Sequence, residues 1–171
     1  MKLQFRPSKL KVRRTKLRYI IIHHTAEQYS NPATLVDNPK FQTEKIYNGV
    51  LELKQGDINY NFLIEKINSD YQIIMARPFP YLCEYPDIPN DINNSSIHIG
   101  CMGNYDLKIP DKRFYEVLAY KVINPLMKQY HLTPSLIKLH RDVTTKKDLS
   151  CPGYFFNDDK LYANLRRFVI Q

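Results

Sequence analysis

The chain has 171 residues, 43% of them apolar, which fits one packed domain rather than a disordered or fibrous protein. Its formal net charge of +8 favours binding to polyanions such as nucleic acid, an anionic membrane or an anionic cell wall, without choosing among them. No stretch approaches the roughly 18 apolar residues of a membrane span. Three cysteines, an odd number, argue against a disulfide framework.

Much of the positive charge lies at the start of the chain, where Lys or Arg recurs every few residues up to Arg18. A secretory signal needs an apolar run after its basic start, and none follows here, so we expect the protein to be cytoplasmic when made. We divide the chain into a basic segment, residues 1–17, and a domain, residues 18–171. The segment is either an arm that binds an acidic partner or a solvated end.

The first strand is predicted at residues 18–22, a β-branched run without polar alternation, which is typical of a strand buried on both faces. It stops at His23-His24-Thr25. Asn-Pro pairs mark turns in residues 26–40. Weak helical spacing predicts a helix over residues 40–53.

Two further strands are predicted at residues 59–66 and 71–76, joined by a hairpin turn at Asn68-Ser69-Asp70. Residues 77–94 contain four prolines and form a long loop, and long loops in compact domains are often functional. A fourth strand is expected over residues 96–102.

The second half of the chain predicts a helix over residues 111–130, capped by Asp111 and kinked or split at Pro125. A short strand over residues 136–139 ends at His140, and a last helix starts at Asn157 or Asp158. The fold class is therefore α/β, a single domain with a central mixed sheet flanked by helices.

His23 and His140 each follow a predicted strand, at positions where α/β domains collect their sites, and Cys151 follows eleven residues after His140. Two imidazoles and a thiolate suit zinc, and three protein ligands leave a fourth position for water, which is the catalytic pattern. On chemistry alone the alternative stands that these are polar strand ends and a buried Cys.

Five motifs in order resemble the type 2 N-acetylmuramoyl-L-alanine amidases, a family of small phage lysozyme-amidases and animal peptidoglycan recognition proteins. Two of them resemble the family's Gly-Tyr-His-Phe and Ser-Ile-Gly-Ile strands, and three resemble its ligand motifs. They are YIIIHHTA at 19–26, NYNFLI at 59–64, SIHIGCMGNY at 96–105, LHRDV at 139–143 and CPG at 151–153.

The resemblance implies an enzyme that hydrolyses the amide bond between N-acetylmuramic acid and L-alanine in peptidoglycan, with zinc as cofactor. It implies His23, His140 and Cys151 as ligands. It assigns His23 rather than His24 as the first zinc ligand. Side chains alternate along a strand, so only one of these two histidines can face a cleft, which agrees with that assignment. The implied role of Tyr60 is to orient the water or steady the oxyanion, and its alternative is packing in the sheet.

The chain departs from the family at Leu149, where many relatives carry a Lys two residues before the third ligand. The preceding segment is longer here, so Lys146 or Lys147 could reach the same space, and we assign Lys147. The alternative is that both are solvated loop residues, and the peptidoglycan recognition amidases do without this Lys.

The loop at 77–94 also lacks the Ala-His-Ala-like segment of many relatives. Arg77 could bind the acidic stem peptide, although surface packing explains it equally. We add Asn104 and His24 as candidate substrate-binding residues, with a core position as the alternative for His24.

A phage or prophage endolysin fits the small size, the basic charge and the absence of an export signal, because a phage releases its amidase through a holin. The alternatives are a non-catalytic peptidoglycan-binding module and an amidase-like regulator that binds a polymerase. Cys151 disfavours the first of these. We find no recognised basic-aromatic motif that would support direct nucleic-acid binding. We expect the protein to be a monomer.

Overall fold

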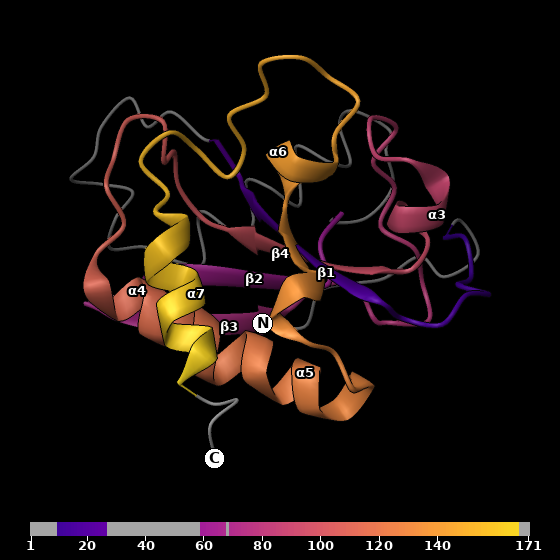
Figure 1. The fold of residues 1–171 in the computed structure, drawn as a ribbon, viewed down its shortest axis with the longest axis horizontal. Helices are drawn as coiled ribbons and strands as arrows, with labels where there is room; N and C mark the ends of the chain where they lie inside the picture. The colour runs from indigo at the N-terminus through magenta and orange to yellow at the C-terminus, as the bar shows by residue number, and fades with distance from the viewer. Residues whose placement is uncertain (1–9, 27–58, 68, 168–171) are drawn as a thin grey trace.

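The computed structural model describes residues 10–26, 59–67 and 69–167, which contain a five-stranded sheet in the order β3-β2-β4-β1-β5 (Figure 1). The pairs β1–β4, β1–β5 and β2–β4 are parallel and β2–β3 is antiparallel, so the predicted mixed sheet is confirmed. The strands are β1 Tyr19–His24, β2 Phe62–Ile67, β3 Asp70–Met75, β4 Ser96–Cys101 and β5 Ile137–Leu139. Each lies within a few residues of its predicted range, whereas the predicted helix over 40–53 lies outside the described residues.

Side chains of the central strands alternate between two different surroundings. Ile20 and Ile22 of β1, with Ile97 and Ile99 of β4, enter the main hydrophobic core. Their neighbours in sequence point to the opposite face, because successive side chains of a strand alternate. This opposite face carries His23, and the pairing of His23 with Gly100 in β4 fixes its position across the sheet.

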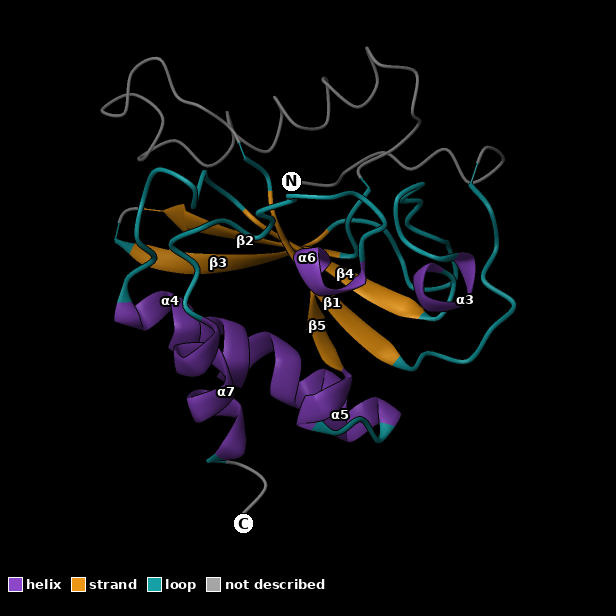
Figure 2. Ribbon diagram, turned by 45° about the horizontal axis from the view of Figure 1, so that its top comes forward, coloured by secondary structure: helices purple, strands orange, loops and turns teal. Residues whose placement is uncertain are grey.

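One helical layer covers the core face, and Figure 2 shows α4, α5 and α7 on the same side of the sheet. Phe114, Leu118 and Leu161 are fully buried in this layer. Full burial of a large apolar side chain contributes about 1.5–3 kcal/mol. The helices are α4 Lys112–Val117, the π-helical η2 Leu118–Ile123, α5 Asn124–Tyr130 and α7 Asp158–Arg166.

The ends of these helices follow the predicted signals. The Oδ1 of Asp111 accepts a hydrogen bond from the Phe114 N–H at 2.8 Å, and Asn157 caps α7 in the same way through Lys160. The interruption expected at Pro125 takes the form of the π-helical turn η2. Pro125 itself lies in the first turn of α5, where its missing N–H is tolerated.

The other face of the sheet carries the loops and two short helices, α3 Asn90–Asn93 and α6 His140–Val143, and the 3-10 turn η3 Pro134–Leu136 precedes β5. The long loop predicted at 77–94 is therefore present, with α3 near its end. Its first half is anchored by Arg77, whose guanidinium donates to the Asn59 side chain and to the Leu82 carbonyl.

Part of the basic N-terminal segment packs on the domain. Arg13 donates to the carbonyls of Phe79, Asn94 and Ser96, and Leu17 belongs to the core. Of the predicted segment 1–17, residues 10–17 are thus attached to the domain and not a separate arm, while residues 1–9 lie outside the described part.

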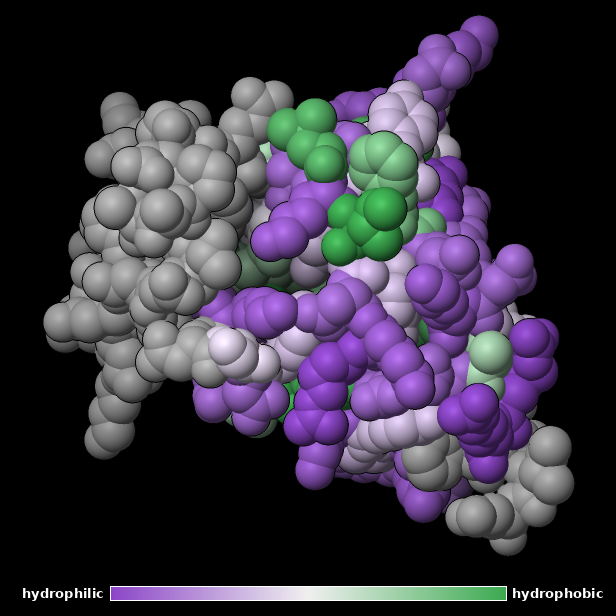
Figure 3. Space-filling model, turned by 90° about the vertical axis from the view of Figure 1, so that its left-hand side faces the viewer, coloured by the Kyte–Doolittle hydropathy of each residue, from purple (hydrophilic) through white to green (hydrophobic). Residues whose placement is uncertain are grey.

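The surface seen in Figure 3 is mostly hydrophilic, with hydrophobic side chains gathered in one area. Scattered exposed apolar residues are ordinary in a water-facing domain. Among the described helices, none has the length and apolar character needed to cross a bilayer.

Candidate functional site

The strand register places His23 and His140 side by side. Ile22 pairs with Leu139 in parallel strands, so the residues that follow them, His23 in β1 and His140 at the start of α6, lie next to each other. The rings of His23 and His140 lie 4.5 Å apart between centroids. The carboxyl ends of parallel strands are where α/β domains build sites, and the first two predicted ligands meet there.

Cys151 completes a group of three side chains. The potential ligand atoms of His23, His140 and Cys151 all lie within 4.8 Å of one another, and all three residues are buried. The Cys151 Sγ is 4.0 Å from Nδ1 of His23. His23 and Cys151 are some 130 residues apart in the sequence, and the fold brings their side chains together, as the motifs predict.

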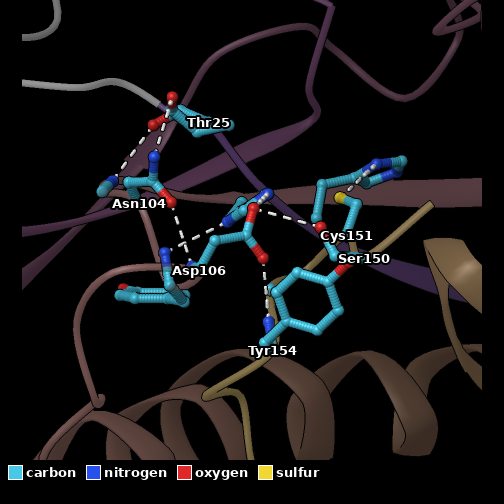
Figure 4. A network of polar contacts seen from close by, with 12 residues as sticks. Thr25, Asn104, Asp106, Ser150, Cys151 and Tyr154 are labelled. Atoms are coloured by element: carbon cyan, nitrogen blue, oxygen red, sulfur yellow. Dashed lines mark hydrogen bonds and ion pairs between the residues drawn. The ribbon is translucent and has the colours of Figure 1, made fainter. Parts of the chain in front are cut away.

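The turn that carries Cys151 is held against the loop after β4. Gly153 has φ +116°, and a Cβ added to it would lie 2.5 Å from the Tyr105 carbonyl carbon, so only glycine fits here. Asp106 links the same two segments, because its carboxylate accepts from the Ser150 hydroxyl and from the Tyr154 N–H (Figure 4). The position of Cys151 thus depends on contacts made by its neighbours on both sides.

His140 has a carboxylate beside it. Its Nε2 lies 3.0 Å from Oδ2 of Asp87, a buried residue of the 77–94 loop. The contact is short but bent, since Nε2 meets no partner in straight hydrogen-bond geometry. The Thr144 hydroxyl donates to the same carboxylate oxygen at 2.8 Å and holds it in place.

His23 is enclosed by rings. Tyr85, from the same loop as Asp87, stacks on it at 4.4 Å with an interplanar angle of 17°. The Nε2 of His23 lies 2.9 Å from Nδ1 of His98, a residue of β4. Its Nδ1 is the nitrogen that faces Cys151.

Burial dominates the protonation of the three residues. It lowers the pKa of His23 well below its usual value, with the neighbouring histidines lowering it further. It lowers the pKa of His140 too, although Asp87 opposes the shift. Burial raises the pKa of the Cys151 thiol to about 12, while a hydrogen bond from the His24 main chain acts in the opposite direction. At neutral pH, without a cation, the group is two neutral imidazoles and a thiol.

This donor set fits zinc. Tetrahedral zinc with bonds of about 2.0–2.1 Å to nitrogen and about 2.3 Å to sulfur holds N and S donors roughly 3.6 Å apart. The 4.0 Å between His23 Nδ1 and Cys151 Sγ needs a movement of a few tenths of an ångström, and ligand atoms at the upper separation of 4.8 Å would have to approach by about 1 Å. A buried carboxylate beside a ligating histidine, as Asp87 is beside His140, is the usual support of such a ligand.

Tyr60 lies next to the three residues, its ring 5.7 Å from that of His23 in an edge-on arrangement. Gly100 makes room for it, because a Cβ there would lie 2.8 Å from the Tyr60 ring. Burial raises the pKa of Tyr60 above its usual value. The phenol therefore stays protonated and can act as a hydrogen-bond donor.

The lysines of the 144–148 loop differ in position. Lys147, the predicted catalytic lysine, and Lys146 are both exposed. The Nζ of Lys146 lies 3.9 Å from Oδ2 of Asp87 and is thereby next to His140. Of the two candidates that the sequence left open, the structure brings Lys146 to the site.

The three residues predicted to bind substrate all make contacts within the protein. His24 points to the opposite face from His23, and its Nδ1 accepts the Tyr105 N–H at 3.2 Å, which fits the core alternative. Arg77 is buried within the base of the loop, at 2% exposure, so the expected contact with a stem peptide is replaced by an internal role. Asn104 accepts from the Asp106 N–H and shapes the loop beside Thr25.

Sequence reasoning missed three residues of the site, which are Tyr85, Asp87 and His98. Tyr85 and Asp87 lie in the 77–94 loop, in which Arg77 alone was predicted as a site residue. His98 occupies the position of Gly in the family's Ser-Ile-Gly-Ile strand, and that replacement of glycine by a ligand-type residue was the available signal.

The family model described as N-acetylmuramoyl-L-alanine amidase matches residues 13–154. A comparison with curated protein sequences gives no match.

Similar solved structures share the fold. The amidase LysC from Clostridium intestinale URNW is 22% identical, with 88% of this chain and 86% of that chain covered and a TM-score of 0.64. The Ph2119 endolysin from Thermus scotoductus MAT2119 bacteriophage Ph2119 is 21% identical, with 91% and 89% covered and a TM-score of 0.62. Drosophila peptidoglycan recognition protein SD is 21% identical, with 93% and 85% covered and a TM-score of 0.62. The chain belongs to the N-acetylmuramoyl-L-alanine amidase family.

Proposed function

We propose that this protein is a zinc amidase that hydrolyses the bond between N-acetylmuramic acid and L-alanine in bacterial peptidoglycan. The observation that carries the proposal is the convergence of His23, His140 and Cys151 at the edge of the sheet, in a chain of the amidase family. Zinc at such a site lowers the pKa of a bound water to about 7 and polarises a carbonyl.

The residues of this chain supply the rest of the chemistry. We assign Tyr60, a protonated phenol beside the ligands, the role of stabilising the negative charge that develops on the carbonyl oxygen. Lys146 supplies a positive charge next to Asp87 and takes the role that the sequence assigned to Lys147.

The biological setting that we propose is a phage or prophage endolysin, made in the cytoplasm and acting on the wall after release. Two of the solved structures that the chain resembles are described as endolysins. The net charge of +8 supports attraction to anionic wall polymers.

A binding role without catalysis is the second candidate, because peptidoglycan recognition proteins share the fold and two of the similar solved structures contain bound tracheal cytotoxin. The presence of Cys151 and Tyr60 favours the amidase.

The experiment is mass analysis of fragments released from purified peptidoglycan, with the Cys151→Ser variant and a chelator-treated sample as controls. The amidase should release stem peptides that begin at L-alanine and leave the glycan strands uncut. Cleaved glycan strands would contradict the bond assignment. Sedimentation of the protein with insoluble peptidoglycan, without release of any fragment, would favour the binding module.

A further inference from the structure

A second histidine touches the proposed ligand His23 from the side opposite Cys151. The Nδ1 of His98 lies 2.9 Å from Nε2 of His23, and both residues are buried at 1% exposure or less. Two ring nitrogens at this separation share one hydrogen, so one ring donates and the other accepts. Which ring donates decides which nitrogen of His23 is left for a metal.

The orientation of His23 gives this direction. Its Nδ1 lies 4.0 Å from the Cys151 Sγ, so Nδ1 is the nitrogen that a metal held by Cys151 would take. A nitrogen that binds a metal carries no hydrogen, so the hydrogen of the neutral His23 ring is on Nε2, and Nδ1 of His98 is the acceptor.

We propose that His98 is a positioning residue that fixes the tautomer of His23. In this arrangement Nε2–H of His23 donates to Nδ1 of His98. The free lone pair of His23 is then on Nδ1, the nitrogen 4.0 Å from the Cys151 Sγ. A ligating histidine is commonly oriented by an acceptor at its other nitrogen, here a second imidazole.

The ring of His98 is itself held rigidly. The Oδ1 of Asn61 accepts its main-chain N–H, and the Asn61 N–H donates back to its carbonyl. Tyr85 stacks on His98 at 4.7 Å and 18°, as it does on His23, so one phenol ring aligns both imidazoles. A rigid acceptor of this kind prepares a metal ligand before the metal binds.

This inference rests on the proposed zinc site, and its test separates the two. The first measurement is ¹⁵N NMR of the histidine rings in the metal-free protein, which reports the tautomer directly. We expect hydrogen on Nε2 of His23. Hydrogen on Nδ1 of His23 would overturn the inference, whether or not the protein binds zinc.

The second measurement is zinc affinity by competition with a chromophoric chelator, on a matched pair of variants. His98→Asn keeps an acceptor oxygen close to the Nδ1 position, whereas His98→Leu has nearly the same shape and no acceptor. We expect His98→Leu to weaken zinc by about 10–100-fold and His98→Asn to lose much less. Equal losses in the two variants, or no loss in His98→Leu, would contradict the role, while a wild-type protein that binds no zinc would refute the proposed function instead.

Discussion

The Nε2 of His140 lies 3.0 Å from Oδ2 of Asp87, and both side chains are buried. Burial tends to raise the pKa of Asp87, but its hydrogen bond from Thr144 and the nearby His140 hold that pKa below its usual value. The carboxylate is therefore charged at neutral pH. It engages one nitrogen of His140 and leaves the other for a cation.

Asp87→Asn should weaken zinc binding by about 10–100-fold, because the amide carries no charge to hold His140 in one orientation. The measurement is zinc affinity by chelator competition. Glu84→Gln is the matched control, since Glu84 is an exposed acid of the same loop. An affinity in Asp87→Asn equal to that of Glu84→Gln would show that the contact with His140 does not support metal binding.

Cys151→Ser should weaken zinc by more than that, because it removes a proposed ligand and replaces sulfur with a hydroxyl that ionises poorly. Metal content after dialysis measures the effect. Cys83→Ser is the control, because Cys83 is also buried and free but is not one of the three clustered residues. Unchanged zinc in Cys151→Ser would remove this residue from the site.

Zinc binding should release about one proton per ion at pH 7. The pKa of the Cys151 thiol is raised to about 12, so the thiol is protonated in the metal-free protein and must lose its proton to bind. The histidine pKa values are lowered, so His23 and His140 are already neutral and contribute none. Affinity should accordingly rise about tenfold per pH unit around neutrality.

Calorimetry in buffers of different ionisation enthalpy counts the protons released. A count near zero would mean that the thiol does not bind the metal as thiolate. Repeating the titration with Cys151→Ser should abolish most of the proton release and identifies its source.

Tyr60→Phe should lower turnover by about 10²–10³-fold while zinc stays bound, because a donor to the oxyanion acts in the transition state and not on the metal. Tyr162→Phe is the control, since the Tyr162 hydroxyl of α7 donates to the Ile137 carbonyl of β5. Steady-state release of stem peptides and zinc content are measured together. Full turnover in Tyr60→Phe would return this residue to a packing role.

Gly153→Ala should lower the free energy of unfolding by more than about 3 kcal/mol, since it combines a positive φ with a clash against the Tyr105 main chain. Gly103→Ala should cost less, about 1–3 kcal/mol, because its φ is also positive but the nearest atom lies 3.4 Å away. Urea unfolding measures both. Equal costs would show that the close approach at Gly153 relaxes easily.

Most of the strands and helices could be predicted from the sequence, because they depend on local patterns of residues. The apolar run before His23, the cap at Asp111 and the hairpin between β2 and β3 are all encoded within a few neighbouring residues. The ordered motifs also identified the three candidate ligands, although their spacing in sequence has no geometric meaning.

Only the tertiary structure decided what surrounds those ligands. Asp87 and Tyr85 reach the site through an irregular loop, whose path has no period that a sequence can show. His98 reaches His23 through strand pairing, and the Nζ of Lys146 lies 3.9 Å from Oδ2 of Asp87. Local sequence sets local conformation, whereas the partners of a buried polar group are fixed by register and packing across distant segments.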